Sequence, residues 1–305
     1  MATKTSLLGL TKPAYTDAAD IAVLNTNFDL IDKAVGNGRH ARNELDNSDF
    51  SAARFIARAG LNGMHDATVY LGDRWRGHAN ITATQQTDGV MLNASAASAY
   101  IMQRVSVKPG QAYTLAFHAT GRSGTHRMVV YNSGVTTIVS YDQAADRDLL
   151  LVNFTASEDT MAMLYYPGYS TSGGSTVLHW AALYEGTYTA DTLPAYVYKG
   201  YAAELAECQR YFNRIAAQPV GGWCYNWGRA TMFVPLPVTM RSTSPDVVLT
   251  SASSNFYIGS TTYATTALDG CNAADNGVNV YFKHTNNVSG QCVMPEFAAD
   301  FIDDL

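Results

Sequence analysis

Residues 107–117 read VKPGQAYTLAF. A Pro-Gly pair, which favours a turn, is followed by large apolar side chains at every second position, Tyr113, Leu115 and Phe117. Side chains of a β-strand point alternately to its two faces, so this spacing places the three on one buried face. The stretch therefore predicts a turn that leads into a half-buried β-strand.

Similar strand candidates flank this stretch on both sides. Between about residues 67 and 185, short apolar or alternating segments recur, separated by turn pairs such as Asp88-Gly89 and Ser133-Gly134. Roughly eight to ten such strands suit a jelly roll, and the residues beyond about 230 return to the same pattern. We predict a mainly β fold, a jelly-roll sandwich followed by a second β-sandwich, with short N-terminal and interdomain α-helices.

The clearest helix is predicted for residues 16–35, capped by Thr16 or Asp17 and ended by Gly36 and Gly38. Apolar residues recur along it at spacings of three and four: Ile21, Leu24, Phe28, Ile31 and Val35. A helix this short is marginal alone, so the stripe has to be buried on something. We expect self-association or docking to another protein, and the alternative is packing on its own domain.

A second helix is predicted for residues 202–215, where Pro219 and two glycines follow. Its apolar stripe consists of Leu205, Cys208, Phe212 and Ile215. We interpret Leu205 and Phe212 as further contacts between subunits.

The patterns divide the chain into residues 1–38 with the first helix, a connector at 39–66, the jelly roll at 67–187, a linker at 188–200, and a second sandwich with its leading helix at 201–305.

Composition limits the partners. Charged residues make up 15% of the chain and the formal net charge is −6, with Lys and Arg scattered, which argues against a nucleic-acid partner. No apolar run approaches the ~20 residues of a membrane span. The first residues also lack the apolar core of a signal peptide, so we expect folding in the cytosol and no membrane insertion.

Motifs of enzymes and metal sites are missing from the sequence. There is no G-x-S-x-G, no H-E-x-x-H and no C-x-x-C spacing among the four cysteines, which we expect to be reduced. Acidic pairs such as Glu158 and Asp159 stand in turn-like sequence and are interpreted as solvated. We therefore expect no catalytic residue, no cofactor and no metal ligand set, and a protein that binds without turnover.

Sugar binding needs exposed aromatic rings with polar groups at their edges. Candidates in the jelly roll and in the last domain are Trp75, Tyr131, Tyr166, Trp223, Tyr225 and Trp227. Trp75 stands between two arginines, which favours the surface. The adjacent Tyr165 and Tyr166 point to opposite faces of a strand, so at most one of them is expected in the core.

The last three candidates alternate in GGWCYNWGR, residues 221–229. Their spacing places them on one face of a strand-like segment. That face can serve as a stacking platform for a ligand, or it can pack in the core or against another subunit.

Several segments resemble bacteriophage tail proteins. Residues 6–35, SLLGLTKPAYTDAADIAVLNTNFDLIDKAV, resemble the virion-attachment end of tail-fibre and receptor-binding proteins. ELAECQRYF at 204–212, followed by MRSTSP at 240–245, is similar to the C-terminal domain of tail-fibre tips. This resemblance implies a homotrimeric virion protein of the tail, assembled in the host bacterial cytoplasm and held by tail or baseplate proteins through its N-terminal segment.

A second resemblance covers residues 67–186. DGVMLNASAASAYIMQRVSVKPGQAYTLAFHATG at 88–121 and TVLHWAALYEG at 176–186 are similar to jelly-roll carbohydrate-binding modules. The resemblance implies attachment to a host-surface polysaccharide. It also implies a structural calcium ion, for which Asp66, Asp73 and Asp88 are candidates.

Two other functions remain compatible with the sequence. One is a tail-associated enzyme that degrades polysaccharide, and the other is a structural spacer of the tail that binds nothing itself. An enzyme would release new reducing ends from host capsule, whereas a spacer would not bind glycans at all.

Overall fold

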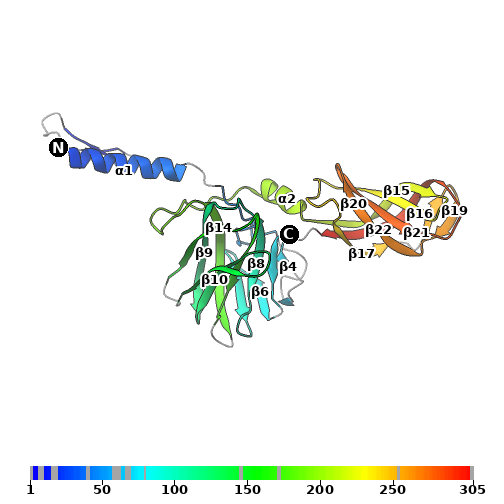
Figure 1. Cartoon of the computed structure of the whole chain (residues 1–305), viewed down its shortest axis with the longest axis horizontal. Helices are drawn as coiled ribbons and strands as arrows, with labels where there is room; N and C mark the ends of the chain where they lie inside the picture. The colour runs from blue at the N-terminus through cyan, green and yellow to red at the C-terminus, as the bar shows by residue number, and fades with distance from the viewer. Residues whose placement is uncertain are drawn as a thin grey trace. The chain divides into compact units, whose positions relative to one another are not determined.

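The computed structural model describes residues 3–5, 10–14, 20–38, 42–56, 63–65, 70–78, 80–143, 147–169, 173–252 and 255–302. The predicted mainly β fold with short helices is confirmed. The chain forms two compact units (Figure 1), one of residues 1–55, 60–69 and 76–198, the other of residues 56–59, 70–75 and 199–305. Neither described helix has the length and apolar content to cross a membrane.

The N-terminal part consists of a short hairpin and a helix. Strands β1 (Thr3–Lys4) and β2 (Thr11–Lys12) pair, and α1 spans Ile21–Gly38. The side chain of Asp20 accepts a hydrogen bond from the Ala22 amide at 2.8 Å and so caps the helix. The predicted cap residues 16 and 17 lie outside the described residues, and the helix includes Gly36 before it ends at Gly38.

The first unit is a sandwich of two antiparallel sheets. One has the order β11-β10-β13-β8-β5, formed by Thr137–Gln143, His126–Tyr131, Thr160–Tyr166, Ile101–Ser106 and Trp75–Gly77. The other has the order β12-β9-β14-β7-β6-β3, formed by Leu149–Thr155, Ala112–Ser123, Gly174–Glu185, Val90–Ala94, Ile81–Gln85 and Gly63–His65. Tyr113, Leu115 and Phe117 of β9 are buried as predicted, and the Phe117 ring lies 5.0 Å from that of Tyr165 in β13. The expectation of a half-buried strand was wrong, because Thr114 and Ala116 between them are buried as well.

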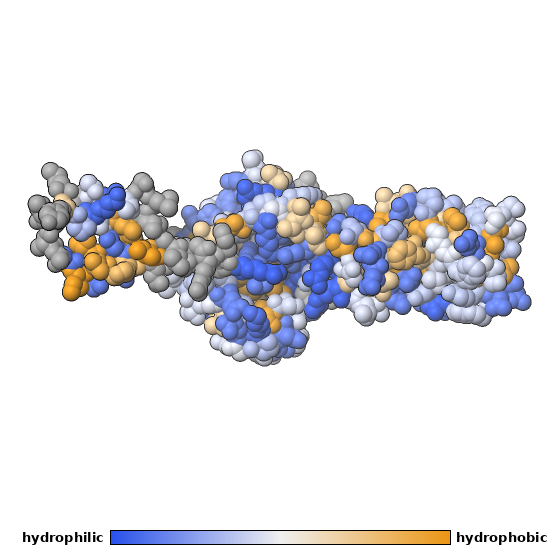
Figure 2. Space-filling model, turned by 90° about the horizontal axis from the view of Figure 1, so that it is seen from above, coloured by the Kyte–Doolittle hydropathy of each residue, from blue (hydrophilic) through white to orange (hydrophobic). Residues whose placement is uncertain are grey.

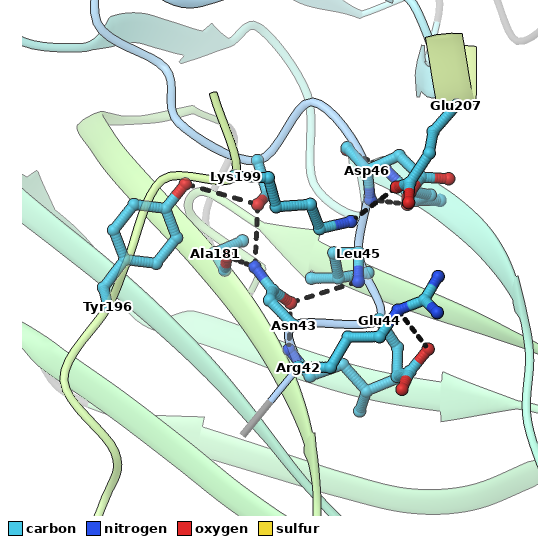
Figure 3. A network of polar contacts seen from close by, with 12 residues as sticks. Arg42, Asn43, Glu44, Leu45, Asp46, Ala181, Tyr196, Lys199 and Glu207 are labelled. Atoms are coloured by element: carbon cyan, nitrogen blue, oxygen red, sulfur yellow. Dashed lines mark hydrogen bonds and ion pairs between the residues drawn. The ribbon is translucent and has the colours of Figure 1, made fainter. Parts of the chain in front are cut away.

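Residues 43–50 extend the second sheet beside β14. The amides of Glu44 and Phe50 donate to the carbonyls of Leu183 and His179, both at 2.9 Å. Figure 3 shows how Asn43 holds this segment: its Nδ2 donates to the Ala181 carbonyl at 3.0 Å, and its Oδ1 accepts from the Leu45 amide at 3.1 Å. The same Oδ1 also accepts a hydrogen bond from the Leu183 amide at 2.9 Å. Residues 43–50, which the sequence assigns to a connector, thus form part of the sandwich.

The second unit begins with α2 (Tyr201–Gln209) and continues as one eight-stranded sheet. Its strands are β15 (Phe212–Tyr225), β16 (Arg229–Pro235), β17 (Asp246–Ala252), β18 (Asn255–Ile258), β19 (Thr261–Ala264), β20 (Ala267–Ala274), β21 (Gly277–Lys283) and β22 (Gly290–Ile302). The order is β19-β18-β22-β15-β16-β21-β20, with β17 also paired to β22. The inner face encloses a core that includes Met232, Val280 and Phe297. The short strand β4 (Tyr70–Gly72) is grouped with this unit.

The predicted helix at 202–215 was wrong at its C-terminal end. The helix stops at Gln209, and Phe212 already begins β15, where it pairs with Ile302 of β22. Phe212 is buried, so it does not offer the outward subunit contact that the stripe predicted, while Leu205 is half-buried on α2. The long antiparallel ladder with β22 satisfies more backbone groups than one further helical turn would, and this outweighs the local periodicity.

Candidate functional site

The outer face of the second unit carries an exposed row of aromatic residues. In β15 the side chain of Cys224 is buried in the core, so its neighbours Trp223 and Tyr225 point outward. Their exposed fractions are 46% and 37%, and Trp227, in the turn before β16, is 65% exposed. Gly228 permits this turn with a φ of +93°, and its amide donates to the Tyr225 carbonyl at 3.1 Å.

The rings are ordered with respect to one another. Tyr225 and Trp227 stack with ring centroids 5.2 Å apart and planes 27° apart. Arg229, the register partner of Tyr225 on β16, places its guanidinium 3.7 Å from the ring centroid of Tyr281 on β21. Two stacked pairs from three strands therefore share one side of the sheet. We call these residues, with Trp223, the C-terminal aromatic face.

Charged side chains border the C-terminal aromatic face. Asp269 on β20 lies 2.9 Å from Nζ of Lys283 and 3.4 Å from Nε of Arg229. The hydrogen bond from Lys283 is the main cause that lowers the pKa of Asp269, so its carboxylate stays ionised down to acidic pH. Gln291 is the register partner of Trp223 on β22. Rings bordered by an amide, a carboxylate and two cations suit a ligand with an apolar face and polar edges.

An apolar stretch adjoins this face. Tyr257 of β18 pairs with Val293 of β22, which in turn pairs with Gly221 of β15. The side chains of Tyr257 and Val293 point outward, and so does that of Phe233 of β16. This side of the sheet therefore also has the composition of a contact between subunits, which is the alternative that the sequence leaves open.

The jelly roll presents a second aromatic group on the outer face of β10, β13 and β8. Tyr166 packs between Tyr100 and Tyr169, with centroid distances of 5.4 and 5.3 Å. Tyr131 is half-buried beside them. We call these four residues the jelly-roll tyrosine cluster.

Two of the predicted sugar contacts in the jelly roll were wrong. Tyr166 is 5% exposed because its neighbours cover it, and Tyr165 on the opposite face is buried as well, so both adjacent tyrosines are buried. Trp75 is fully buried although arginines flank it. Neighbouring residues in a strand point to opposite sides, so the charge of Arg76 does not determine the exposure of Trp75.

The stripe of α1 is exposed in the chain described here. Ile21, Leu24, Phe28 and Ile31 are all exposed, and Figure 2 shows apolar side chains gathered along this part of the molecule. The other side of the helix is occupied, because Asn27 exchanges two hydrogen bonds with the backbone of Thr11, at 2.8 and 2.9 Å.

The calcium candidates differ in environment. Asp73 is buried in the turn after β4, and Asp88 lies exposed in the turn before β7, 3.7 Å from His179. Asp66 lies outside the described residues. The calcium ion stays a prediction.

Sequence reasoning found Trp223, Tyr225 and Trp227 of the C-terminal aromatic face but missed the other residues of the face and the charges that border it. Arg229, Asp269, Tyr281 and Lys283 come from three strands that are neighbours only in the folded sheet. The alternation within β21 could have shown that Tyr281 and Lys283 share a face. Which strand pairs with which was not readable from one sequence.

Comparison with known proteins adds a limited structural similarity. No protein-family model and no curated protein sequence matches the chain. A CBM4 structure has a TM-score of 0.31 and 20% identity, covering 37% of this chain and 95% of its own. The enzymatically active domain of tailspike protein 4 from bacteriophage CBA120 has a TM-score of 0.28 and 11% identity, covering 43% of this chain and 21% of its own.

A tandem CBM22 domain of Paenibacillus barcinonensis Xyn10C covers 84% of this chain and all of its own, with a TM-score of 0.30 and 8% identity. At these values the similarity identifies neither a family nor a ligand for this chain.

Proposed function

We propose that this chain is a structural protein of a phage tail, a fibre or a baseplate receptor-binding protein, that attaches the virion to host-surface glycans. The observation that carries the proposal is the C-terminal aromatic face. Three aromatic side chains, Trp223, Tyr225 and Trp227, remain exposed where a soluble surface would normally carry polar groups. Exposed aromatic side chains that gather on one face mark a surface that contacts a partner. The charged groups at the edge of this face favour a partner that carries hydroxyl groups.

The mechanism is binding by stacking and edge hydrogen bonds. A pyranose ring has an apolar face, which can lie on the Tyr225–Trp227 pair, while its hydroxyl groups reach Asp269, Lys283 or Gln291. The paired charges of Asp269 and Lys283 supply both an acceptor and donors to the same sugar. The proposed mechanism is binding alone, with no nucleophile and no general acid, and it leaves the glycan intact.

The exposed stripe of α1 supports the particle role. Four large apolar side chains on one helix face, Ile21, Leu24, Phe28 and Ile31, would be buried against sister chains in a homotrimer or against tail and baseplate proteins. A trimer holds three weak glycan sites at high effective concentration, so avidity makes attachment firm. The proposed location is the virion tail, after assembly in the host cytoplasm.

Binding of the labelled full-length chain to host cells tests the proposal. Trp227→Ala is expected to weaken binding at least tenfold, because it removes the more exposed ring of the Tyr225–Trp227 pair and avidity multiplies the loss. Tyr201→Ala is the control, since Tyr201 is another exposed aromatic residue of the same unit, on α2, with 54% of its surface exposed against 65% for Trp227. Equal binding by the wild type and Trp227→Ala would contradict the assignment of this face.

The second candidate is a spacer whose C-terminal aromatic face packs against another subunit. The exposed Phe233, Val293 and Tyr257 favour it. In that case Trp227→Ala would change the subunit number in a mass measurement and the wild type would not bind cells. New reducing ends from host polysaccharide would instead indicate the degrading enzyme.

A further inference from the structure

A β-bulge turns one arginine into the interior of the jelly roll. The register between β9 and β14 shifts after Ser175, so β9 carries one residue more than β14 at this point. Gly121 permits the bulge with a φ of +56°. Ser123 then points outward, where its Oγ lies 3.1 Å from Oγ of Ser175. Its neighbour Arg122 therefore points inward, between the two sheets.

The charged end of Arg122 is buried without a partner. Nη1 and Nη2 are both inaccessible to solvent, and neither has a hydrogen-bond acceptor among the described residues. None of the described carboxylates forms an ion pair with this guanidinium either. A charged group that leaves water without a counter-charge destabilises the fold strongly. The position of Arg122 therefore indicates a negative ligand that the described side chains do not supply.

A second unpartnered nitrogen belongs to the other strand of the same hairpin. His126 of β10 is fully buried, and its Nδ1 lies 2.6 Å from the hydroxyl oxygen of Tyr165 in β13. Nε2 of His126 has no hydrogen-bond partner within the part of the chain that the structure describes. When Nδ1 accepts the proton of the Tyr165 hydroxyl, Nε2 carries the ring proton and is available as a donor.

Arg122 and His126 lie close enough to affect each other. Burial first, and the charge of Arg122 second, lower the pKa of His126. The pair also lies near solvent, because Arg122 as a whole residue is half-buried and the next two residues, Ser123 and Gly124, are exposed. The hairpin thus places three buried nitrogen atoms at one end of the sandwich, next to an exposed turn.

We infer that Arg122 and His126 bind one small anion, either a chloride ion or a carboxylate group, at this end of the jelly roll. The two terminal nitrogens of a guanidinium donate parallel hydrogen bonds to a carboxylate, and Nε2 of His126 adds a third donor. The bound anion also compensates the buried charge of Arg122. This site belongs to the first unit and the C-terminal aromatic face to the second, so the inference does not depend on the proposed function.

Chloride-35 NMR of the full-length chain tests the site, because a chloride ion that exchanges with a protein site broadens the signal of free chloride. The wild type is expected to give saturable broadening that corresponds to one ion per chain. Arg122→Met, which keeps a long side chain without its charge, is expected to weaken chloride binding at least tenfold. Arg147→Met is the matched control and is expected to bind like the wild type, since Arg147 is an exposed arginine of the same unit.

Sodium acetate distinguishes the two ligands. If acetate removes the broadening at a concentration similar to that of chloride, the site also accepts carboxylate groups. Broadening that acetate leaves unchanged assigns the site to chloride alone.

The pH dependence of binding tests the part of His126. Among the described residues, the titratable or charged groups beside His126 are Arg122 and Tyr165, and its register partner on β11, Gln143, is uncharged. A bound anion favours the imidazolium form, so chloride is expected to bind at least threefold more tightly at pH 5 than at pH 7. His126→Asn is expected to keep a weaker site and to lose this difference.

Two results overturn the inference. One is a wild type that shows no saturable broadening and whose melting temperature rises no more with chloride or acetate than that of Arg122→Met. The other is broadening that persists unchanged in Arg122→Met. If Arg122→Met does not fold, crystals of the wild-type chain soaked in sodium bromide decide. An anomalous signal is expected within hydrogen-bonding distance of Arg122, and its absence there contradicts the site.

Discussion

At the scale of single residues, the jelly roll contains an ionisable group that its core keeps neutral. His126 is fully buried, and its Nδ1 lies 2.6 Å from the Tyr165 hydroxyl. Burial is the first cause, and the nearby Arg122 the second, that lowers the pKa of His126 from 6.5 to about 4. The folded protein therefore holds this imidazole without charge at neutral pH.

This predicts a loss of stability in weak acid. The folded-state pKa is depressed below the unfolded value, so the unfolded chain takes up a proton first, and stability present above pH 6.5 is lost as the pH falls towards 4. At pH 4 the free energy of unfolding is expected to be lower by about 2–3 kcal/mol than at pH 7. Urea unfolding of the jelly roll at pH 7 and pH 5 measures it.

His126→Asn provides the comparison for that experiment. The asparagine amide can replace Nδ1 toward Tyr165 and does not titrate in this range. The variant is expected to lose less stability than the wild type between the two pH values. A wild type and a variant with the same pH dependence would assign the acid sensitivity to other groups.

At the scale of elements, two adjacent glycines of β15 have opposite surroundings. A Cβ on Gly222 would lie 1.9 Å from the Thr231 carbonyl oxygen and 2.8 Å from Cα of Met232, whereas a Cβ on Gly221 would meet nothing within 4 Å. Close approach of β15 and β16 therefore requires glycine at 222 alone. The register of these two strands places Trp223 and Arg229 on the same face.

Gly222→Ala is accordingly expected to destabilise the second unit by about 3 kcal/mol, because backbone atoms cannot move aside as a flexible side chain can. Gly221→Ala is expected to change stability by less than about 0.5 kcal/mol. Thermal unfolding of both variants checks the pair. If the two melt at the same temperature, the register of β15 against β16 is not the one described.

The stripe of α1 gives a prediction about assembly. Replacing Leu24 and Phe28 together by serine is expected to convert a trimer of the full-length chain into monomers, since these residues form the centre of the proposed contact. Asn25→Ser, also at an exposed position of α1, is the control. Light scattering coupled to size exclusion reads the mass. A wild-type chain that is already monomeric would contradict the proposed trimer.

Helices and strands could be predicted from the sequence where the local spacing of apolar residues determines the secondary structure. The alternation at Tyr113, Leu115 and Phe117 identified β9, and the heptad-like spacing identified α1. The same spacing misled at Phe212, because pairing with Ile302, ninety residues later, decides its state. The burial of Trp75 likewise depends on packing that residue type and neighbours do not encode.

At the scale of the whole molecule, two β units and an exposed helix stripe fit a protein that works by adhesion. The sequence predicted the mainly β fold with short helices and the three exposed aromatic side chains of the C-terminal aromatic face. Arg229, Tyr281 and the bordering charges of Asp269 and Lys283 could be assigned to the same site only from the order of strands in the sheet, which follows from long-range pairing. Resemblance to tail proteins suggests the biological setting, which stays a prediction, whereas the exposed rings bear only on the proposed contact with a ligand or partner.

Calorimetric titration of purified host-surface polysaccharide into the full-length chain tests the claim that the C-terminal aromatic face binds glycan. The account predicts saturable binding by the wild type and at least a tenfold loss in the double variant Trp223→Ala, Trp227→Ala, with unchanged melting temperature and subunit number. Undiminished binding by that double variant, or no heat of binding from the wild type with any host polysaccharide, would contradict it.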